Sequence, residues 1–287
     1  MIVQRRAIYA GVETRELSVS GAGPTIVLLH GFADSADCWR PVLTLLERAG
    51  RTAVAVDLVG FGAADSTRWG PLLPQWDEFV EAVVAQHGAT SAVVLVGNSL
   101  GGLLTVRAAA TVKGLPIRGV VAIDAAGTGW TPLVRAVIVQ NLLLLTPLVA
   151  LPVPPMVRRA GVTLVARIVL YGRWRSADPE TIDSFAKGIR TRRDAQRLIA
   201  VARRTVGEVN AHGPFDGIDC ATVVLHGRRD LLVSVDAARR LHRMIPGSRL
   251  VVLERSGHCP QLDAPERVAA LAIELAATAT PRRAGTA

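Results

Sequence analysis

The alternation of short apolar segments with longer helical segments constrains the fold of this chain more than any other feature. The apolar segments consist mostly of Val, Leu, Ile and Ala, without the strict alternation of apolar and polar residues that marks a half-exposed strand. Continuous apolar strands of this kind are typical of a parallel sheet that is buried on both faces. The six predicted strands are Thr25–Leu29, Ala53–Asp57, Ala92–Val96, Gly119–Asp124, Ala221–Leu225 and Arg249–Leu253.

Five helical segments lie between or after these strands. Strands that alternate with helices predict an α/β fold, in which a mostly parallel central sheet carries helices on both faces. The first 20 residues are expected to add an antiparallel hairpin at the start of the sheet. The predicted helices are Trp39–Arg48, Gln75–His87, Leu100–Val112, Val235–Met244 and Pro265–Ala277.

The regular alternation fails in the middle of the chain, where the sequence becomes helical and proline-rich. We therefore predict a core formed by residues 1–126 and 215–287, with residues 127–214 inserted as a helical cap over one end of the sheet. Within this insertion Pro132–Val157 is apolar, but Arg135 and several prolines interrupt it. A helix that spans a membrane needs about 20 mostly apolar residues. We expect no membrane span here, whereas peripheral contact with a membrane through the cap stays open.

Polar and titratable residues follow the predicted strands at the points where each strand ends. Ligand sites of open α/β sheets lie beyond the carboxyl ends of the strands, so these residues are the first candidates for a site. Ser99, Asp124, Asp230 and His258 all lie in such positions. Four of the six strand ends thus carry an acid, a base or a nucleophile, which indicates a catalytic site.

The segment "GNSLGG", Gly97–Gly102, places Ser99 between a strand and a helix. Glycines two residues before and after the serine permit the sharp turn that exposes a nucleophilic hydroxyl. A serine hydroxyl needs a base, and the base needs an acid that orients it. His258 is the candidate base and Asp230 the candidate acid, in the chain order that this type of turn uses. Asp124 is the alternative acid.

Four motifs in this order resemble the α/β-hydrolase superfamily, in its esterase- and lipase-like branch with a serine nucleophile and a helical cap. The resemblance implies that the backbone N–H groups of Phe32 and Leu100 form an oxyanion hole, and that residues 127–214 shape the substrate pocket. Such enzymes need neither a metal nor an organic cofactor. The motifs are "HGF" at His30–Phe32, "GNSLGG" at Gly97–Gly102, "GRRD" at Gly227–Asp230 and "GHCPQLDAPE" at Gly257–Glu266.

The function expected from this resemblance is hydrolysis of a carboxylic ester with an apolar acyl or aromatic part. His30, Asn98 and Trp130 are candidate pocket residues. The turn around Ser99, "GNSLGG", also resembles that of carbon–carbon bond hydrolases. Those enzymes usually carry a tryptophan shortly after the catalytic histidine, whereas this chain has "CPQL" after His258. Cleavage of a vinylogous diketone is therefore the alternative, together with a cofactor-free perhydrolase or haloperoxidase. A scaffold without activity is a remote alternative, because the full set of three residues is present.

Composition excludes several other classes of protein. The three cysteines, Cys38, Cys220 and Cys259, show no spacing that indicates a disulfide framework or a zinc site. The formal net charge is +9, but the arginines are dispersed and no nucleic-acid-binding motif accompanies them. The N-terminal segment lacks the apolar stretch of a secretory signal, so we expect a cytoplasmic protein. The oligomeric state cannot be predicted.

Overall fold

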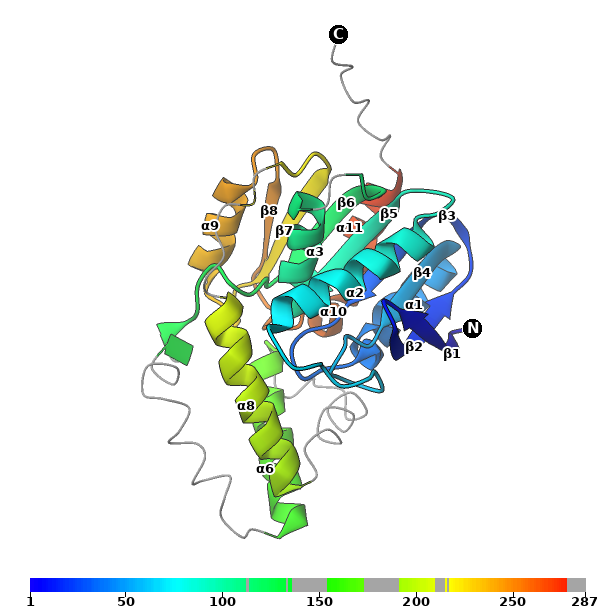
Figure 1. Cartoon of the computed structure of the whole chain (residues 1–287). Coiled ribbons are helices and arrows are strands. Elements are labelled where there is room, and N and C mark those ends of the chain that lie inside the picture. Colours follow the sequence, from blue (N-terminus) through cyan, green and yellow to red (C-terminus); the bar gives the residue numbers. More distant parts are fainter. Residues whose placement is uncertain are drawn as a thin grey trace.

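The computed structural model describes residues 1–111, 114–132, 134–135, 154–172, 191–209, 215 and 217–277 (Figure 1). Their centre is an eight-stranded sheet with the strand order β1-β2-β4-β3-β5-β6-β7-β8. The strands are β1 (Val3–Tyr9), β2 (Val12–Val19), β3 (Ala22–Leu29), β4 (Arg51–Val56), β5 (Val93–Asn98), β6 (Ile117–Ile123), β7 (Ala221–Gly227) and β8 (Arg249–Leu253).

Strands β3 to β8 pair only in parallel with one another, as the uninterrupted apolar segments predict. The side chains of β5, Val93–Asn98, are all buried, because helices cover both faces of the central strands. The N-terminal hairpin is confirmed as well: β1 pairs antiparallel with β2, and β2 pairs antiparallel with β4. The predicted α/β fold class is therefore confirmed.

Helices cover both faces of the sheet (Figure 1). The sheet therefore separates the hydrophobic core into two clusters, one on each face. One core cluster lies under α2, α3 and α9, with Trp76, Phe79 and Leu104 among its members. The other lies under α1 and α11, with Leu43 and Leu271 among its members. The helices are α1 (Arg40–Arg48), α2 (Leu72–His87), α3 (Leu100–Thr111), α9 (Val235–Met244) and α11 (Pro265–Ala277), with a short helix α10 (Pro260–Asp263) and a 3₁₀ helix η1 (Ala36–Trp39).

Two further helices, α6 (Pro155–Leu170) and α8 (Arg192–Val209), lie outside the layers of the sheet domain (Figure 1). Both belong to the segment that the sequence predicts as a cap. Glu208 on α8 accepts hydrogen bonds from the backbone N–H groups of Leu72 and Leu73, so α8 is fixed to the start of α2. The boundaries at residues 127 and 214 stay a prediction, because parts of this segment lie outside the described residues.

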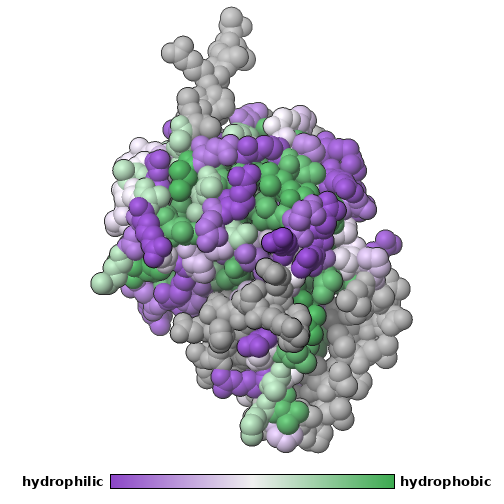
Figure 2. All heavy atoms as spheres, turned by 180° about the vertical axis from the view of Figure 1, so that it is seen from behind, coloured by the Kyte–Doolittle hydropathy of each residue, from purple (hydrophilic) through white to green (hydrophobic). Residues whose placement is uncertain are grey.

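An apolar face of α6 is exposed. On the side shown in Figure 2, hydrophobic side chains extend along the part of the molecule that α6 forms. Much of the apolar segment Pro132–Val157 lies outside the described residues, and among those that are described no helix is long and apolar enough to cross a membrane. Peripheral contact with a membrane stays a prediction. The exposed apolar residues of α6 are Met156, Val157, Leu164, Val165 and Ile168.

Two glycines allow α3 to start directly behind β5. A Cβ atom at Gly97 would lie 2.1 Å from the carbonyl oxygen of Gly101, and one at Gly101 would lie 2.2 Å from that of Leu29. Real Cβ atoms essentially never approach an atom within 3.0 Å. The backbones of β3, β5 and α3 therefore meet at this turn without side chains between them, which explains the glycines on both sides of Ser99.

We expect Gly101→Ala to destabilise the fold by about 3 kcal/mol or more, because the added methyl group meets backbone that cannot move without opening the sheet. The matched control is Gly161→Ala in α6, where nothing lies within 4 Å of the added Cβ. There the gain in helix propensity stabilises by about 0.5–1 kcal/mol. Urea unfolding of both variants measures the difference, and equal stability of the two would contradict this description of the turn.

Candidate active site

Ser99 lies in a strained turn between β5 and α3. Its φ is +55°, a left-handed conformation that side chains other than glycine rarely adopt. Several backbone hydrogen bonds hold it there: its N–H donates to the carbonyl oxygen of Ile123 at 2.8 Å, and its carbonyl accepts from Leu103 and Ala126. The surrounding sheet and helix thus fix a conformation that local preferences oppose, as is common at functional sites.

His258 and Asp230 form a hydrogen-bonded pair. Nδ1 of His258 lies 2.7 Å from Oδ2 of Asp230. The other carboxylate oxygen of Asp230 accepts from the backbone N–H groups of Leu232 and Val233, at 2.7 and 3.1 Å. Both side chains are buried. Asp230 therefore fixes the orientation of the ring and leaves Nε2 of His258 as the nitrogen that can exchange a proton with a substrate or nucleophile.

The pKa values of the two groups follow from this pairing. Burial alone would lower the pKa of His258, but the negative charge of Asp230 and the hydrogen bond to it outweigh burial and raise that pKa. Burial would likewise raise the pKa of Asp230, but the imidazole of His258 lowers it overall. Asp230 is thus a carboxylate at neutral pH, ready to stabilise a positive charge on His258.

Asp124 lies beside this pair at the end of β6. One ligand atom each of Asp124, Asp230 and His258 lies within 4.8 Å of the other two. Such a set suits a cation in principle, but the hydrogen bond between His258 and Asp230 already uses two of its members. Burial and the charge of Asp230 both raise the pKa of Asp124 well above its usual range, which favours the protonated form of this carboxyl group.

Asp124 is also bound differently from Asp230. Its Oδ1 accepts from the backbone N–H of Gly227 at 3.0 Å, whereas its Oδ2 is buried without a hydrogen-bond partner. Oδ1 of Asp124 also lies 2.9 Å from Nδ1 of His226, whereas the hydrogen bond to the imidazole of His258 belongs to Asp230. The structure therefore favours Asp230 over Asp124 as the acid that orients His258.

Two contacts hold the loop that carries His258. Nδ2 of Asn98 donates to the carbonyl oxygen of His258 at 2.8 Å. Oδ2 of Asp263 accepts from the backbone N–H of Gly257 at 2.7 Å and from that of Gly172 at 2.9 Å, and so joins this loop to the end of α6. Asp263 was not among the residues that the sequence singled out, since its acceptor role depends on a segment far away in the chain.

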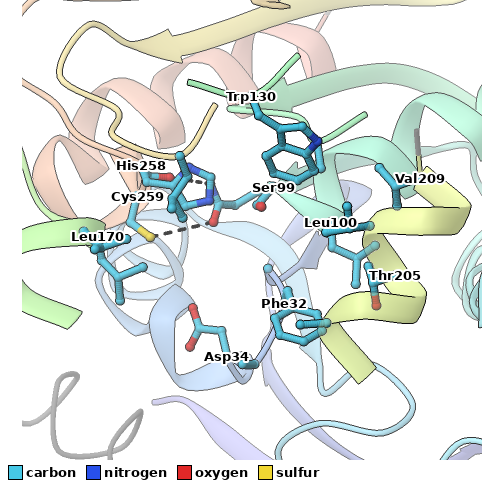
Figure 3. Close-up of a pocket in the computed structure, with 18 of the residues that line it drawn as sticks. Phe32, Asp34, Ser99, Leu100, Trp130, Leu170, Thr205, Val209, His258 and Cys259 are labelled. Carbon is cyan, nitrogen blue, oxygen red and sulfur yellow. Dashed lines mark hydrogen bonds between the residues drawn. The ribbon is translucent and has the colours of Figure 1, made fainter. Parts of the chain in front are cut away.

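A cavity of about 300 Å³ opens at this edge of the sheet (Figure 3). Its walls come from the turns after β3, β5 and β8 and from the helices α6 and α8, and most of the side chains that form them are apolar. The lining residues include Gly31, Phe32, Asp34, Asn98, Ser99, Leu100, Trp130, Leu170, Thr205, Val209, Leu232, His258 and Cys259. The cavity therefore brings Ser99 and His258 together under an apolar cover.

Comparison with known proteins supports the family that the sequence motifs resemble. Residues 26–271 match the sequence pattern of the alpha/beta hydrolase family. The chain belongs to this family. It is therefore a hydrolase. The matched part covers both flanks of the predicted cap, the second half of β3 and every strand from β4 onward.

Several relatives of this hydrolase have names that state an activity. A pimeloyl-[acyl-carrier protein] methyl ester esterase of Stenotrophomonas maltophilia is 26% identical over 275 residues, which cover 94% of this chain and 99% of that protein. Among solved structures, a 2-hydroxy-6-oxo-6-phenylhexa-2,4-dienoate hydrolase from Rhodococcus has 22% identity and a TM-score of 0.75, with 96% of this chain and 98% of that chain covered. A putative lipase from Acinetobacter baumannii reaches 0.75 at 18% identity, over 95% and 90% of the two chains. At these identities the structural matches concern the fold.

Most of the predicted site residues of this hydrolase meet at the cavity. Phe32, Asn98, Leu100 and Trp130 line it beside Ser99 and His258, while Asp230 lies behind His258. Leu100 is the first residue of α3, so its N–H has no acceptor within the helix.

His30 is the exception among the predicted pocket residues and requires a correction. It is fully buried, its Nε2 accepts from the backbone N–H of Leu58 at 2.8 Å, and its Nδ1 lies 2.7 Å from the carbonyl oxygen of Gly31. Both ring nitrogens thus bind backbone groups of the turns after β3 and β4. His30 is not among the residues that line the cavity.

Proposed function

We propose that this hydrolase cleaves a carboxylic ester by nucleophilic catalysis at Ser99. Oγ of Ser99 attacks the ester carbonyl carbon while Nε2 of His258 takes its proton. The same proton passes to the leaving alcohol, which departs as the acyl-enzyme forms. A water molecule, deprotonated by His258, then attacks the acyl group and releases the acid and Ser99. The backbone N–H groups of Phe32 and Leu100 are the proposed donors to the oxyanion, each typically worth about 3 kcal/mol.

One observation carries this proposal: a strained serine and a histidine held by a buried carboxylate line the same cavity. Backbone hydrogen bonds hold the strained serine at the end of the sheet. The pair of His258 and Asp230 supplies a base with a defined tautomer. No other described serine combines a left-handed backbone with a place in this cavity. This is the arrangement that activates a hydroxyl group, which is otherwise a weak nucleophile.

The lining of the cavity supports an apolar substrate. Leu170, Val209 and Leu232 are among the aliphatic residues around it, and Trp130 adds an aromatic wall. The methyl ester esterase among the relatives also supports an ester as the scissile group. The proposed substrate is therefore a small-molecule ester with an apolar acyl or aromatic part that fills the space under the cap.

A series of p-nitrophenyl esters from acetyl to dodecanoyl tests the proposal. We expect hydrolysis with an optimum at medium chain length, since a cavity of about 300 Å³ cannot enclose the longest chains. If the protein hydrolyses no ester, although a fluorophosphonate labels Ser99, the nucleophile is correct and the ester is the wrong substrate class. Vinylogous diketones, the substrates of the carbon–carbon bond hydrolases, are then the next compounds to assay.

The pH dependence of kcat/KM follows from the pairing of His258. The imidazole must be neutral to accept the proton of Ser99, and Asp230 raises its pKa above the ordinary value of 6.5. We therefore expect activity to rise with pH along an acid limb whose midpoint lies above that value. Removal of the charge in Asp230→Asn shifts the limb to lower pH. An unchanged limb in this variant would show that another group controls the profile.

A further inference from the structure

A carboxyl group that forms no ion pair with the described part of the chain lines the apolar cavity. Asp34 lies in the turn after β3, just beyond Gly31 and Phe32. Its neighbours Asp37 and Asp57 both pair with Arg15, at 2.7 and 2.9 Å. No basic side chain of the described residues forms an ion pair with Asp34.

Asp34 is turned toward the interior of the cavity. In Figure 3 its carboxylate extends from the turn into the space on the side of Leu170 and Cys259. The residue also lines a second cavity of about 260 Å³, whose walls include Ser66 and Arg197. Asp34 thus lies where the apolar cavity beside Ser99 meets a more polar one, a place that the far end of a bound substrate can reach.

The structural role of Asp34 uses only part of its hydrogen-bonding capacity. Its Oδ1 accepts from the backbone N–H of Ser35 at 2.8 Å, a bond that an asparagine or serine side chain makes equally well. The other described donor beside the carboxyl group is the thiol of Cys38, which donates weakly. A carboxyl group has about four acceptor positions, and these two described donors leave some of them unused.

Asp34 is half-buried, and a carboxyl group with unused acceptor positions is unfavourable in a cavity whose other side chains are mostly apolar. Burial raises the pKa of Asp34, which reflects the unfavourable transfer of its charge away from water. If the cavity held only hydrocarbon, an asparagine or serine would keep the hydrogen bond to Ser35 at this position without a buried charge. Such a cost is offset when a ligand brings a hydrogen-bond donor to the group.

We infer that Asp34 is a specificity-determining residue, which selects esters whose apolar chain carries a hydrogen-bond donor, a hydroxyl or ammonium group, at its far end. This inference rests on the proposed function, because it assumes that the ester reacts at Ser99. It narrows the substrate class from apolar esters in general to esters with an apolar middle and a polar end.

Matched substrates and variants test the inference. We would compare ethyl hexanoate, ethyl ω-hydroxyhexanoate and ethyl ω-aminohexanoate as substrates of the wild type, Asp34→Leu and Asp34→Asn, and quantify the released acid by chromatography. The wild type should prefer both donor-bearing esters over ethyl hexanoate by about tenfold or more in kcat/KM. Asp34→Leu should lose this preference, because its similar volume offers no acceptor.

The asparagine variant distinguishes the two kinds of donor. Asp34→Asn keeps an acceptor for a hydroxyl group and for Ser35 but loses the negative charge, so it should retain the preference for the hydroxyl ester and lose that for the ammonium ester. Circular dichroism of both variants confirms that the turn still folds. Equal kcat/KM values of the wild type for all three esters, or unchanged ratios in Asp34→Leu, would overturn the inference.

A binding measurement separates this inference from the proposed function. Hexanamide and ω-hydroxyhexanamide occupy the cavity without an ester bond, and the shift of melting temperature that each produces needs no hydrolysis. The hydroxyl compound should give the larger shift in the wild type and in Ser99→Ala, but not in Asp34→Leu. If all esters are inert and this difference persists, only the ester assignment fails. Equal shifts for both amides would overturn the role of Asp34.

Discussion

We expect the replacement of Ser99 by alanine to abolish the proposed ester hydrolysis and to leave the fold intact. We expect kcat/KM to fall by about 10⁴-fold or more, because no other group forms the covalent intermediate and only binding contributions remain. The stability of the variant should stay within about 1 kcal/mol of the wild type. Alanine accepts the same backbone, and the hydrogen bonds at Ser99 involve its main chain. Initial rates on the preferred p-nitrophenyl ester and a urea titration measure the two quantities.

The control for this variant is Ser91→Ala, a serine that is exposed just before β5. It should keep full activity, which shows that the loss at Ser99 is specific to the site. If Ser99→Ala retained more than a small fraction of wild-type activity, a different residue would carry the nucleophile and the proposed mechanism would be wrong.

The second large effect distinguishes the two carboxyl groups beside His258. Asp230→Asn should lower kcat/KM by about 10⁴-fold, because the amide cannot hold the imidazole in the required tautomer or stabilise its positive charge. Asp124→Asn should cost less than about tenfold, since the hydrogen bond to His258 comes from Asp230 and asparagine has the same shape as aspartate. The comparison is matched, because both changes replace a buried carboxyl group at the end of a strand by its amide.

The activities of Asp230→Asn and Asp124→Asn together show which carboxyl group orients His258. A large loss in Asp124→Asn with little loss in Asp230→Asn would assign the acid to β6 in place of the turn after β7. Equal large losses would mean that the two carboxyl groups act as one unit. Melting temperatures of both variants separate these results from loss of the fold.

The sheet was predictable from the sequence because its strands are buried on both faces. A strand such as β5 is then apolar over most of its length, and the predicted strand Ala92–Val96 differs from the observed Val93–Asn98 by one residue at its start and two at its end. The ends of the strands were less certain: β3 begins at Ala22 and β6 at Ile117, a few residues before the predicted starts. These first residues, Ala22–Pro24 and Ile117–Arg118, are not fully buried and include glycine, proline and arginine, so no continuous apolar segment marks them.

The candidate site was predictable where its residues follow strands, and not where they depend on contacts between distant segments. Ser99 and His258 stand next to glycine-rich turns that mark them. The sequence favoured Asp230 over Asp124 by chain order alone and left Asp124 as the alternative, since both follow strands and β6 pairs with β7. Asp34 and Asp263 gave no signal, because the cavity that one lines and the two loops that the other joins exist only in the fold.

The most direct test of the proposed nucleophile is stoichiometric labelling with a fluorophosphonate, followed by peptide mapping. The mechanism predicts one adduct per chain on Ser99, loss of ester hydrolysis in proportion to labelling, and no adduct in Ser99→Ala. An adduct on another residue, or full hydrolysis by a protein whose Ser99 is completely labelled, would contradict it.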